Sequence, residues 1–268
     1  MKALMRALRA MPAMLRVGFA EMVAYRAELV IWILTALTPI IMLLVWDGVA
    51  ANGPVGGYDR AAFARYFTAG LFVRQLTSSW VVWELNESIR TGTLSPALLK
   101  PIHPLAFRAA ENVVVLPFRL VVMMPIAVAL WLWRPEMGMF IEARALPLCL
   151  LSIALAWAMN FLAQTVFGAL AFFAEQSLGL FNVWFSLWAL LSGYLFPLEL
   201  LPSWARTIVW YLPFRSMLAV PTEIAAGQLG GAEALLEVGV QAIWVVLFFF
   251  AARAMWRAGV RRYEAFGA

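Results

Sequence analysis

Charged residues are scarce in this chain of 268 amino acids, of which 13% are charged and 64% are hydrophobic. A soluble globular domain carries roughly a quarter charged residues, because its surface must face water. The shortage of charge therefore excludes an ordinary soluble domain and indicates a protein of the lipid bilayer. The 13 Trp and 19 Phe residues are typical of long lipid-facing and interfacial surfaces.

The residue types that most often carry chemistry are also rare. The single cysteine, Cys149, excludes an internal disulfide and a cysteine-based metal cluster. The single histidine, His103, has no second histidine or cysteine with which to share a metal. A membrane enzyme needs its acid, base, nucleophile or metal ligands gathered at one depth. We therefore expect this chain to have no catalytic site, no bound metal and no cofactor of its own.

Lysine is almost absent, since Lys2 and Lys100 are the only two. A phosphate-binding loop needs a glycine-rich turn followed by a lysine, and neither lysine stands in such a context. Any ATP and Mg are therefore expected to be bound by a partner protein. The net charge of +5 lies mostly beside apolar segments. That placement is typical of the flanks of membrane spans and argues against a nucleic-acid surface.

The sequence does contain apolar runs of about the 20 residues that a helix needs to cross the hydrocarbon core. We predict an all-α membrane protein, a single domain over residues 1–268, with six transmembrane helices at 29–46, 61–83, 109–133, 145–173, 178–196 and 235–255. An even number of spans puts both termini on one side of the membrane. The excess of basic residues on that side predicts that both termini are cytoplasmic.

Residues 1–26 are predicted to form an amphipathic helix in the inner interface of the membrane. Leu4, Leu8, Met11 and Leu15 recur at helical spacing, while basic side chains lie largely away from this stripe. The alternative is a basic tail that only sets topology.

The inner loop at residues 84–104, between the second and third spans, reads ELNESIRTGTLSPALLKPIHP. We predict a short helix that begins after an N-cap at Ser95 and is stopped by Pro101. Its apolar face would expose Leu94, Leu98 and Leu99 beside a lysine, with no bilayer core to bury them. Docking against a soluble partner and an ordinary linker in the headgroups both remain open for this segment.

The outer segment at residues 193–221 is too apolar for an ordinary loop and too broken for a span. Pro197 is expected to stop the fifth span, and a short helix is expected at 203–211 with Ser203 as its N-cap. These features predict a re-entrant hairpin or half-helices whose polar backbone is covered by protein. An amphipathic surface loop is the alternative.

Two arginines, Arg74 and Arg119, fall near the middle of predicted spans. Intramembrane charges are costly and normally face protein or water. One interpretation is a cavity that attracts an anionic or phosphate-bearing substrate. The other is structural, with pairing to a nearby glutamate (Glu84, Glu111 or Glu175) or snorkelling to an interface. Three amides are expected to bridge helices by hydrogen bonds: Asn160, Gln164 and Asn182.

The inner loop and the outer segment resemble the ABC-2 type membrane subunits of ATP-binding-cassette exporters, in the branch of six-span permeases of about 260 residues. The inner resemblance lies in Gly92-Thr93-Leu94 followed by Leu98-Leu99-Lys100-Pro101. The outer resemblance lies in Ser192-Gly193, then Phe196-Pro197-Leu198-Glu199-Leu200-Leu201-Pro202-Ser203-Trp204, then Leu212-Pro213. The order of these motifs relative to the spans extends the resemblance over nearly the whole chain.

The resemblance implies a permease half in the bacterial inner membrane. It would pair with a second permease chain, identical or paralogous, dock on cytosolic ABC ATPase subunits, contact membrane lipids and bind no nucleic acid. It implies a coupling helix within 84–104, with the ATPase-coupling candidates Glu84, Glu87, Arg90, Gly92, Thr93, Leu94, Leu98, Leu99 and Lys100. Substrate would move outward along candidates Trp32, Thr35, Arg74, Thr77, Arg119, Asn182 and Trp188. The outer hairpin would be shaped by Gly193, Phe196, Pro197, Pro202, Trp204 and Pro213.

A second class of function remains open beside the exporter subunit. Six spans with a polar groove would also suit an ATP-independent channel, a lipid scramblase or a non-transporting membrane scaffold. Movement of substrate without an ATPase or nucleotide would favour this alternative, whereas a neighbouring gene that encodes a P-loop ATPase with an ABC signature would favour the exporter.

Overall fold

The computed structural model describes residues 38–133 and 144–264, and the regular elements within these ranges are helices. This composition agrees with the predicted all-α class. The expected interfacial helix at 1–26, the first half of the first predicted span, and the path candidates Trp32 and Thr35 lie outside the described residues.

The elements run in chain order as follows: α3 Thr38–Val49, η1 Ala50–Asn52, α4 Arg60–Thr77, α5 Val81–Arg90, α6 Leu94–Leu98, α7 Pro104–Val114, α8 Leu116–Trp133, α9 Leu146–Ala169, η3 Leu170–Phe172, α10 Ser177–Leu191, η4 Leu198–Leu200, α11 Ser203–Trp210, α12 Pro213–Ala225 and α13 Gly231–Glu264.

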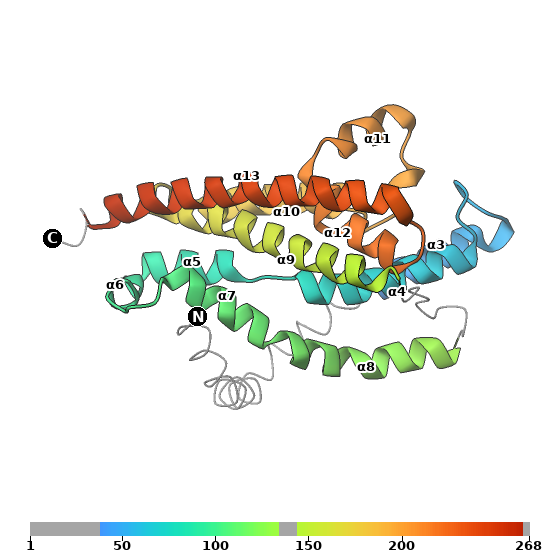
Figure 1. Cartoon of the computed structure of the whole chain (residues 1–268), viewed down its shortest axis with the longest axis horizontal. Coiled ribbons are helices and arrows are strands. Elements are labelled where there is room, and N and C mark those ends of the chain that lie inside the picture. The colour runs from blue at the N-terminus through green and yellow to red at the C-terminus, as the bar shows by residue number, and fades with distance from the viewer. Residues whose placement is uncertain (1–37, 134–143, 265–268) are drawn as a thin grey trace.

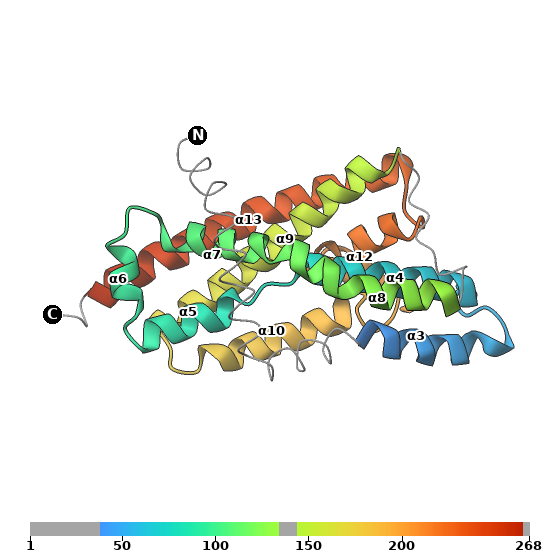
Figure 2. The ribbon, with the colours of Figure 1, turned by 90° about the horizontal axis from the view of Figure 1, so that it is seen from below.

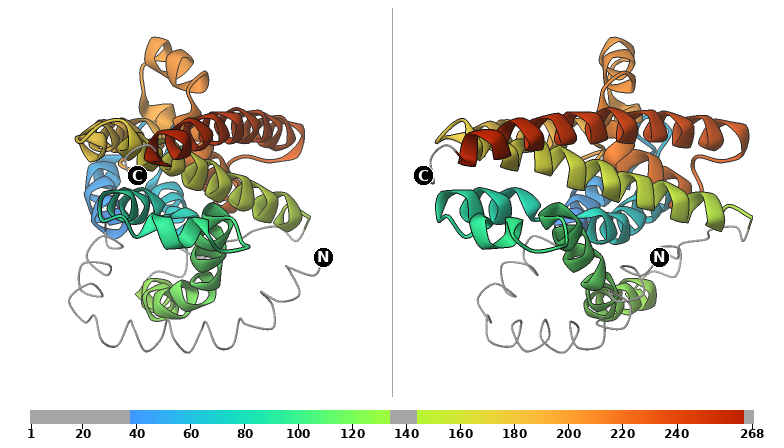
Figure 3. Two further views of the ribbon diagram at one scale, coloured as in Figure 1. Left: turned by 90° about the vertical axis from the view of Figure 1, so that its left-hand side faces the viewer. Right: turned by 60° about the vertical axis from the view of Figure 1, so that its left-hand side comes forward.

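The long helices run roughly along the long axis of the molecule (Figure 1). Helices α9 and α13 pack against each other, and α12 lies against α4, α9 and α13. One end of the molecule carries α6 and the C-terminal end of α13, while η1 and the N-terminal end of α13 lie toward the other (Figures 1 and 2). Helix α11 projects sideways from the bundle (Figure 3).

Three helices in the described ranges are long and apolar enough to cross a membrane: Pro104–Leu132, Leu146–Phe172 and Gly231–Tyr263. They correspond to the third, fourth and sixth predicted spans. Two shorter apolar helices, Thr38–Asn52 and Ser177–Leu191, fall in the first and fifth predicted spans. The total of six spans stays a prediction.

The second predicted span, 61–83, is not one continuous helix. Helix α4 ends at Thr77, residues 78–80 are not helical, and α5 begins at Val81. The hydroxyls of this segment bond the backbone locally, with Thr77 Oγ1 donating to the Val73 carbonyl and Ser78 Oγ to that of Gln75. Such side chains offer the backbone an alternative to the helical ladder, which the apolar pattern did not register.

The fifth span also ends earlier than predicted, at Leu191 and before Pro197. Gly193 has φ of 83°, a left-handed conformation that commonly terminates a helix. The sixth helix, by contrast, continues from the predicted end at 255 to Glu264. Both helices are present as predicted, and the differences concern only the residues at which they end.

The outer segment contains helix α11 and a helix that the sequence analysis did not separate, α12. Every residue of α12 is buried, and its apolar side chains join the largest buried cluster of the described chain. The predicted helix at 203–211 is present as α11, but Ser203 is its first residue and provides no side-chain cap. Half-helices therefore fit this segment; how it sits in a membrane stays a prediction.

The predicted inner loop is more helical than expected, because α5 continues to Arg90. The short helix α6 begins at Leu94, and Ser95 is not its N-cap. Leu94 was expected to be exposed and is instead 2% exposed, since it packs under the loop. Leu98 is half-buried and Leu99 is 88% exposed.

Candidate functional site

The end of the molecule that carries helix α6 is held together by an apolar cluster beneath that helix. Leu94 packs with Leu85 and Ile89 of α5 and with Phe172 and Trp256, from η3 and α13 respectively. These residues come from four separate elements of the chain. A displacement of α6 must therefore be accommodated by α5, η3 and α13 together, because a packed core transmits strain.

A tight turn joins α5 to α6 and is tied to the C-terminal end of α13. Gly92 has φ of 78°, which glycine adopts without steric cost. Thr91 Oγ1 donates to the Glu87 carbonyl at 2.8 Å. The hydroxyls of Ser95 and Tyr263 lie 3.1 Å apart. The part of α13 that the sequence analysis missed thus contacts the predicted coupling segment directly.

The ATPase-coupling candidates separate into an exposed and a buried set. The exposed set presents apolar, basic, acidic and hydroxyl groups on the inner surface, and consists of Glu87, Arg90, Gly92, Thr93, Leu99 and Lys100. Ile102, which was not among the candidates, is 54% exposed and follows Leu99 on the same loop. Leu94 and Leu98 instead hold α6 to the bundle.

Glu84 faces α7 rather than the exposed inner surface. Arg108 Nη1 lies 3.0 Å from Glu111 Oε2 and 3.6 Å from Glu84 Oε2. Burial raises the pKa of the Glu84 carboxyl, and the positive charge of Arg108 opposes that rise. This group therefore joins α5 to α7, and the Glu84 side chain remains 37% exposed.

The two predicted intramembrane arginines have different surroundings. Arg119 is 4% exposed and its Nη1 donates to the carbonyls of Gln75 and Ser78, at 3.1 and 2.8 Å, and to Ser78 Oγ at 2.6 Å. It thereby satisfies the C-terminal end of α4, where helix carbonyls lack partners and the dipole favours a cation. Arg119 stabilises the break between α4 and α5.

Arg74 lies one helical turn before that break and faces α10. Its guanidinium carbon is 4.8 Å from the centroid of the Trp188 ring and 5.9 Å from that of Tyr194. Two path candidates, Arg74 and Trp188, are thus brought together. The other three described ones are not: Arg119 bonds the end of α4, Thr77 is buried with its hydroxyl bonded to its own helix, and Asn182 is on the exposed face of α10.

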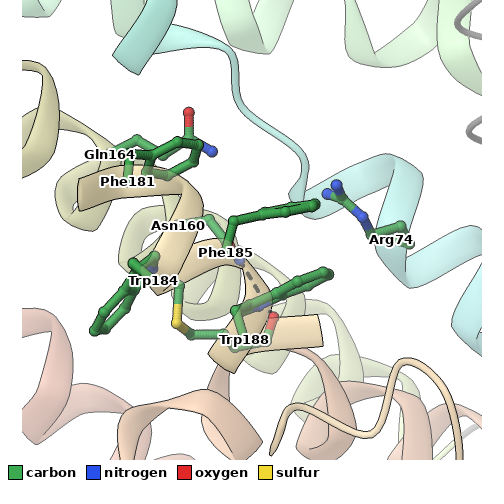
Figure 4. A pocket seen from close by; sticks show the side chains of 8 residues that line it. Arg74, Asn160, Gln164, Phe181, Trp184, Phe185 and Trp188 are labelled. Atoms are coloured by element: carbon green, nitrogen blue, oxygen red, sulfur yellow. Dashed lines mark hydrogen bonds between the residues drawn. The ribbon is translucent and has the colours of Figure 1, made fainter. Parts of the chain in front are cut away.

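A pocket opens beside Arg74, between α4, α9, α10 and α12 (Figure 4). The sequence analysis named Asn160 and Gln164 as bridging amides, and both line it. Asn160 Nδ2 does bridge, donating to the Met217 carbonyl at 3.3 Å. The aromatic wall was missed, although Phe181, Trp184, Phe185 and Trp188 recur every three or four residues, a spacing that places them on one helix face.

The outer hairpin candidates surround the turn that follows α10. Tyr66 donates a hydrogen bond to the Gly193 carbonyl at 2.9 Å. Phe196 packs beside a small cluster of Leu198, Val209 and Ala219, and Pro213 is at the buried start of α12. Pro202 is exposed, and Trp204 is 70% exposed on α11.

A buried charge cluster near this hairpin was not predicted. Arg215 on α12 pairs with Glu223 on the same helix at 2.8 Å and with Glu237 on α13 at 2.7 Å. Glu237 Oε1 also accepts from Trp210 Nε1 at 3.0 Å, and the guanidinium carbon of Arg215 lies 3.8 Å from the centre of a Trp210 ring. The signal was available in the sequence as charges interrupting an apolar segment, at positions 215, 223 and 237.

The described residues thus form an all-helical membrane component with an exposed loop at α6, a break between α4 and α5, and a pocket beside that break. The profile of the ABC-2 family transporter proteins matches residues 32–267, which is most of the chain. The chain belongs to this family, as the resemblance of its inner and outer motifs implied. It is therefore a transmembrane permease component of an ABC transporter. No curated protein has a significant sequence match to the chain.

Proposed function

We propose that this chain is the membrane subunit of an ABC exporter in the bacterial inner membrane, with both termini cytoplasmic. Cytosolic ABC ATPases would bind ATP and Mg and drive substrate outward through a pair of permease chains. The observation that carries the proposal is the exposed loop at α6, where Leu99 stands on a cluster joining α5, η3 and α13. A partner that displaced α6 would move α5 and α13, which pack against the pocket-lining helix α9.

The proposal requires the energy of ATP to favour one global state of the permease over another. A ligand or partner shifts such an equilibrium only by its differential affinity for the two states. In this proposal the ATPase contacts Leu99, Lys100 and Ile102 and holds α6 differently before and after hydrolysis. Since Leu94 is buried with Leu85 of α5, the displacement would pass along α5 to the break at 78–80.

The docking step is tested by a single exposed substitution, Leu99→Asp. The variant should insert and elute as the native chain does, yet lose copurification with the ATPase and its stimulated hydrolysis in nanodiscs. Tyr211→Asp is the matched control, because Tyr211 is 80% exposed on the outer segment. Normal copurification of the Leu99→Asp chain would refute docking at α6.

A second permease chain is proposed to pack on the exposed apolar face of α10, which carries Leu180, Val183, Leu187 and Leu190 beside Asn182. Cys149 is buried, so a Cys149→Ala background makes Asn182→Cys the single thiol. Oxidation should then yield a cross-linked dimer in membranes. Ile243→Cys, on the 62% exposed face of α13, should cross-link far less. Equal cross-linking at both sites would contradict this interface.

Export direction is tested with inside-out vesicles that contain the permease and its ATPase. Untargeted mass spectrometry of the vesicle contents should show ATP-dependent accumulation that is lost when the ATPase cannot hydrolyse ATP. Accumulation at equal rates without nucleotide would favour the channel or scramblase instead.

A further inference from the structure

The pocket beside Arg74 lies within a single chain and is lined by four elements: Arg74 from α4; Asn160 and Gln164 from α9; Phe181, Trp184, Phe185 and Trp188 from α10; and Met217 from α12. Its cavity volume is about 20 Å³. A cavity of that size holds roughly one water-sized group. The enclosed part therefore suits the charged end of a ligand whose body lies at the open side, and is too small for a whole lipid.

Arg74 brings a positive charge to this pocket without a carboxylate to neutralise it. Among the residues that the structure describes, Arg74 forms no ion pair, and its guanidinium contacts the rings of Trp188 and Tyr194. A cation over an aromatic face is attracted to it. Tyr194 also forms a side-chain hydrogen bond with Arg74, and the other N–H donors of the guanidinium remain available. Carboxylate and phosphate are the groups whose geometry matches the donor fork of arginine.

Two further polar atoms in the pocket are buried without a hydrogen-bond partner in the described chain, Trp188 Nε1 and Gln164 Oε1. The indole N–H is a donor only and calls for an acceptor, whereas the Gln164 oxygen is an acceptor and calls for a donor. The Trp188 N–H is therefore the atom that supports an anion. Buried polar groups are normally paired, and an exception needs an explanation. Asn160 does not share this condition, because its Nδ2 already donates to the carbonyls of Ala156 and Met217.

The aromatic wall gives the pocket a flat apolar surface next to the charge. Phe185 and Trp188 are stacked, with ring centroids 5.4 Å apart and an interplanar angle of 17°. Figure 4 shows both rings extending from α10 toward the helix that carries Arg74. Phe185 is 39% exposed, whereas Trp188 is buried. Trp184 instead packs on Phe214, at 4.6 Å between centroids, and backs the wall.

We infer that this pocket binds an organic anion with a flat apolar body, its carboxylate or phosphate on Arg74 and the Trp188 N–H and its body against the exposed ring of Phe185. An aromatic wall alone would also suit an organic cation. The lining contains no acidic residue, so its formal charge is positive and a cation is repelled. The binding itself does not require the exporter; that the bound anion is the transported substrate rests on the proposed function.

The test uses the purified full chain in nanodiscs of zwitterionic lipid and three probes that share a naphthalene body. The probes are 2-naphthoate, neutral 2-naphthalenemethanol and cationic 2-naphthylmethylammonium. Binding is measured by equilibrium dialysis, with empty nanodiscs subtracted for partitioning. We expect 2-naphthoate to bind about 10-fold or more tightly than either other probe, as loss of a charge-assisted contact implies. Equal binding, or tighter binding of the ammonium probe, overturns the inference.

Arg74→Gln should lower 2-naphthoate affinity by about 10-fold or more while leaving that of 2-naphthalenemethanol within about 2-fold. Arg253→Gln is the matched control, since it removes the same charge from an exposed position on α13. If Arg74→Gln does not fold, Arg74→Lys decides, because a point charge without the fork should still prefer the anion but bind it less tightly. An unchanged affinity in the folded variant refutes the role of Arg74.

The source of the anion is distinguished by repeating the dialysis in nanodiscs that contain phosphatidylglycerol. Competitive loss of 2-naphthoate binding identifies a lipid phosphate as a ligand, and unchanged affinity identifies a free small anion; both outcomes support an anion site. The assay needs neither ATPase nor nucleotide. Failure of the anion site therefore appears as absent preference in dialysis, whereas failure of the exporter appears as absent ATPase docking with dialysis unaffected.

Discussion

Arg215 is predicted to be the most sensitive single position in the outer half of the described chain. Its guanidinium is 3% exposed and is shared by the carboxylates of Glu223 and Glu237, at 2.8 and 2.7 Å. Arg215→Met keeps much of the side-chain volume but leaves two carboxylates buried without their cation. Removing one partner of a buried pair costs roughly 3–5 kcal/mol, because the remaining charge is uncompensated.

The structure also predicts how this loss is reversed. In the triple variant Arg215→Met, Glu223→Gln, Glu237→Gln, no charge remains in the cluster, and the carboxamide oxygen at position 237 would still accept from the Trp210 indole. Replacing a buried ion pair with neutral groups is often close to neutral in stability. The triple variant should therefore be more stable than the single one, so that the three substitutions are strongly non-additive.

The measurement is the midpoint of thermal unfolding of the detergent-purified chain at one fixed scan rate. For a chain of this size about 1 kcal/mol corresponds to roughly 2–4 °C, so Arg215→Met should lower the midpoint by roughly 6–20 °C. Arg206→Met, on the projecting helix α11, is the control and should shift it by less than about 2 °C. A triple variant that melts at or below the single variant would show that the charges are not coupled as described.

Three further predictions concern the inner end and the break. Gly259→Ala should lower the unfolding midpoint, because a Cβ there would overlap the ring of Phe172. The control Gly239→Ala, on the same helix, places its Cβ in open space and should leave the midpoint unchanged or raise it by a few degrees. Equal shifts for the two variants would contradict the described packing. Arg119→Met should increase amide deuterium exchange at 76–81 and leave α9 unchanged, since each lost charge-assisted hydrogen bond is worth about 1.5–3 kcal/mol; unaltered exchange there would refute the cap. Burial lowers the pKa of His103, and its neutral Nδ1 accepts a hydrogen bond from the Leu105 amide. Protection of the α7 N-terminus from amide exchange should therefore be present above the unfolded pKa of about 6.5 and be lost as pH falls through the lower folded pKa. After correction for intrinsic exchange, His103→Asn should abolish this pH dependence, and its persistence in the variant would assign it to another group.

Apolar periodicity and length predicted the long helices, because a long apolar run is recognisable from the sequence alone. Helices α9 and α13 were located because their apolar runs exceed the length of a span, and α11 was placed within one residue. The helix ends were less accurate. The break at 78–80 depends on three consecutive hydroxyl side chains and on Arg119, which is 41 residues away from Ser78 in the chain. The local hydropathy of a segment does not report a contact with a residue so far away in the chain.

The candidate site was predicted in its parts but not in its assembly. Arg74 and Trp188 were both named as path residues from the resemblance, yet their contact across 4.8 Å depends on how α4 packs against α10. The aromatic spacing on α10 was visible in the sequence. In an apolar chain, however, this spacing is equally consistent with a helix face that packs in the core and with one that contacts lipid. The buried cluster at Arg215 was missed for a related reason: the contact of Arg215 with Glu237 depends on how α12 packs against α13.

The break in the second span connects the two proposed sites along one stretch of chain. Arg74 lies on the last turn of α4, residues 78–80 are not helical, and α5 runs from Val81 to the turn at Gly92 that positions α6. A continuous helix would carry a displacement of α6 to Arg74 as a rigid body. Because the helix is broken, α5 can instead tilt relative to α4 while the Arg119 guanidinium stays bonded to the carbonyls of Gln75 and Ser78. The coupling between α6 and Arg74 therefore depends on the strength of these hydrogen bonds. A charged side chain within a membrane span is costly. The hydrogen bonds from Arg119 to the end of α4 explain why this position is an arginine, although an apolar residue would fill the same space.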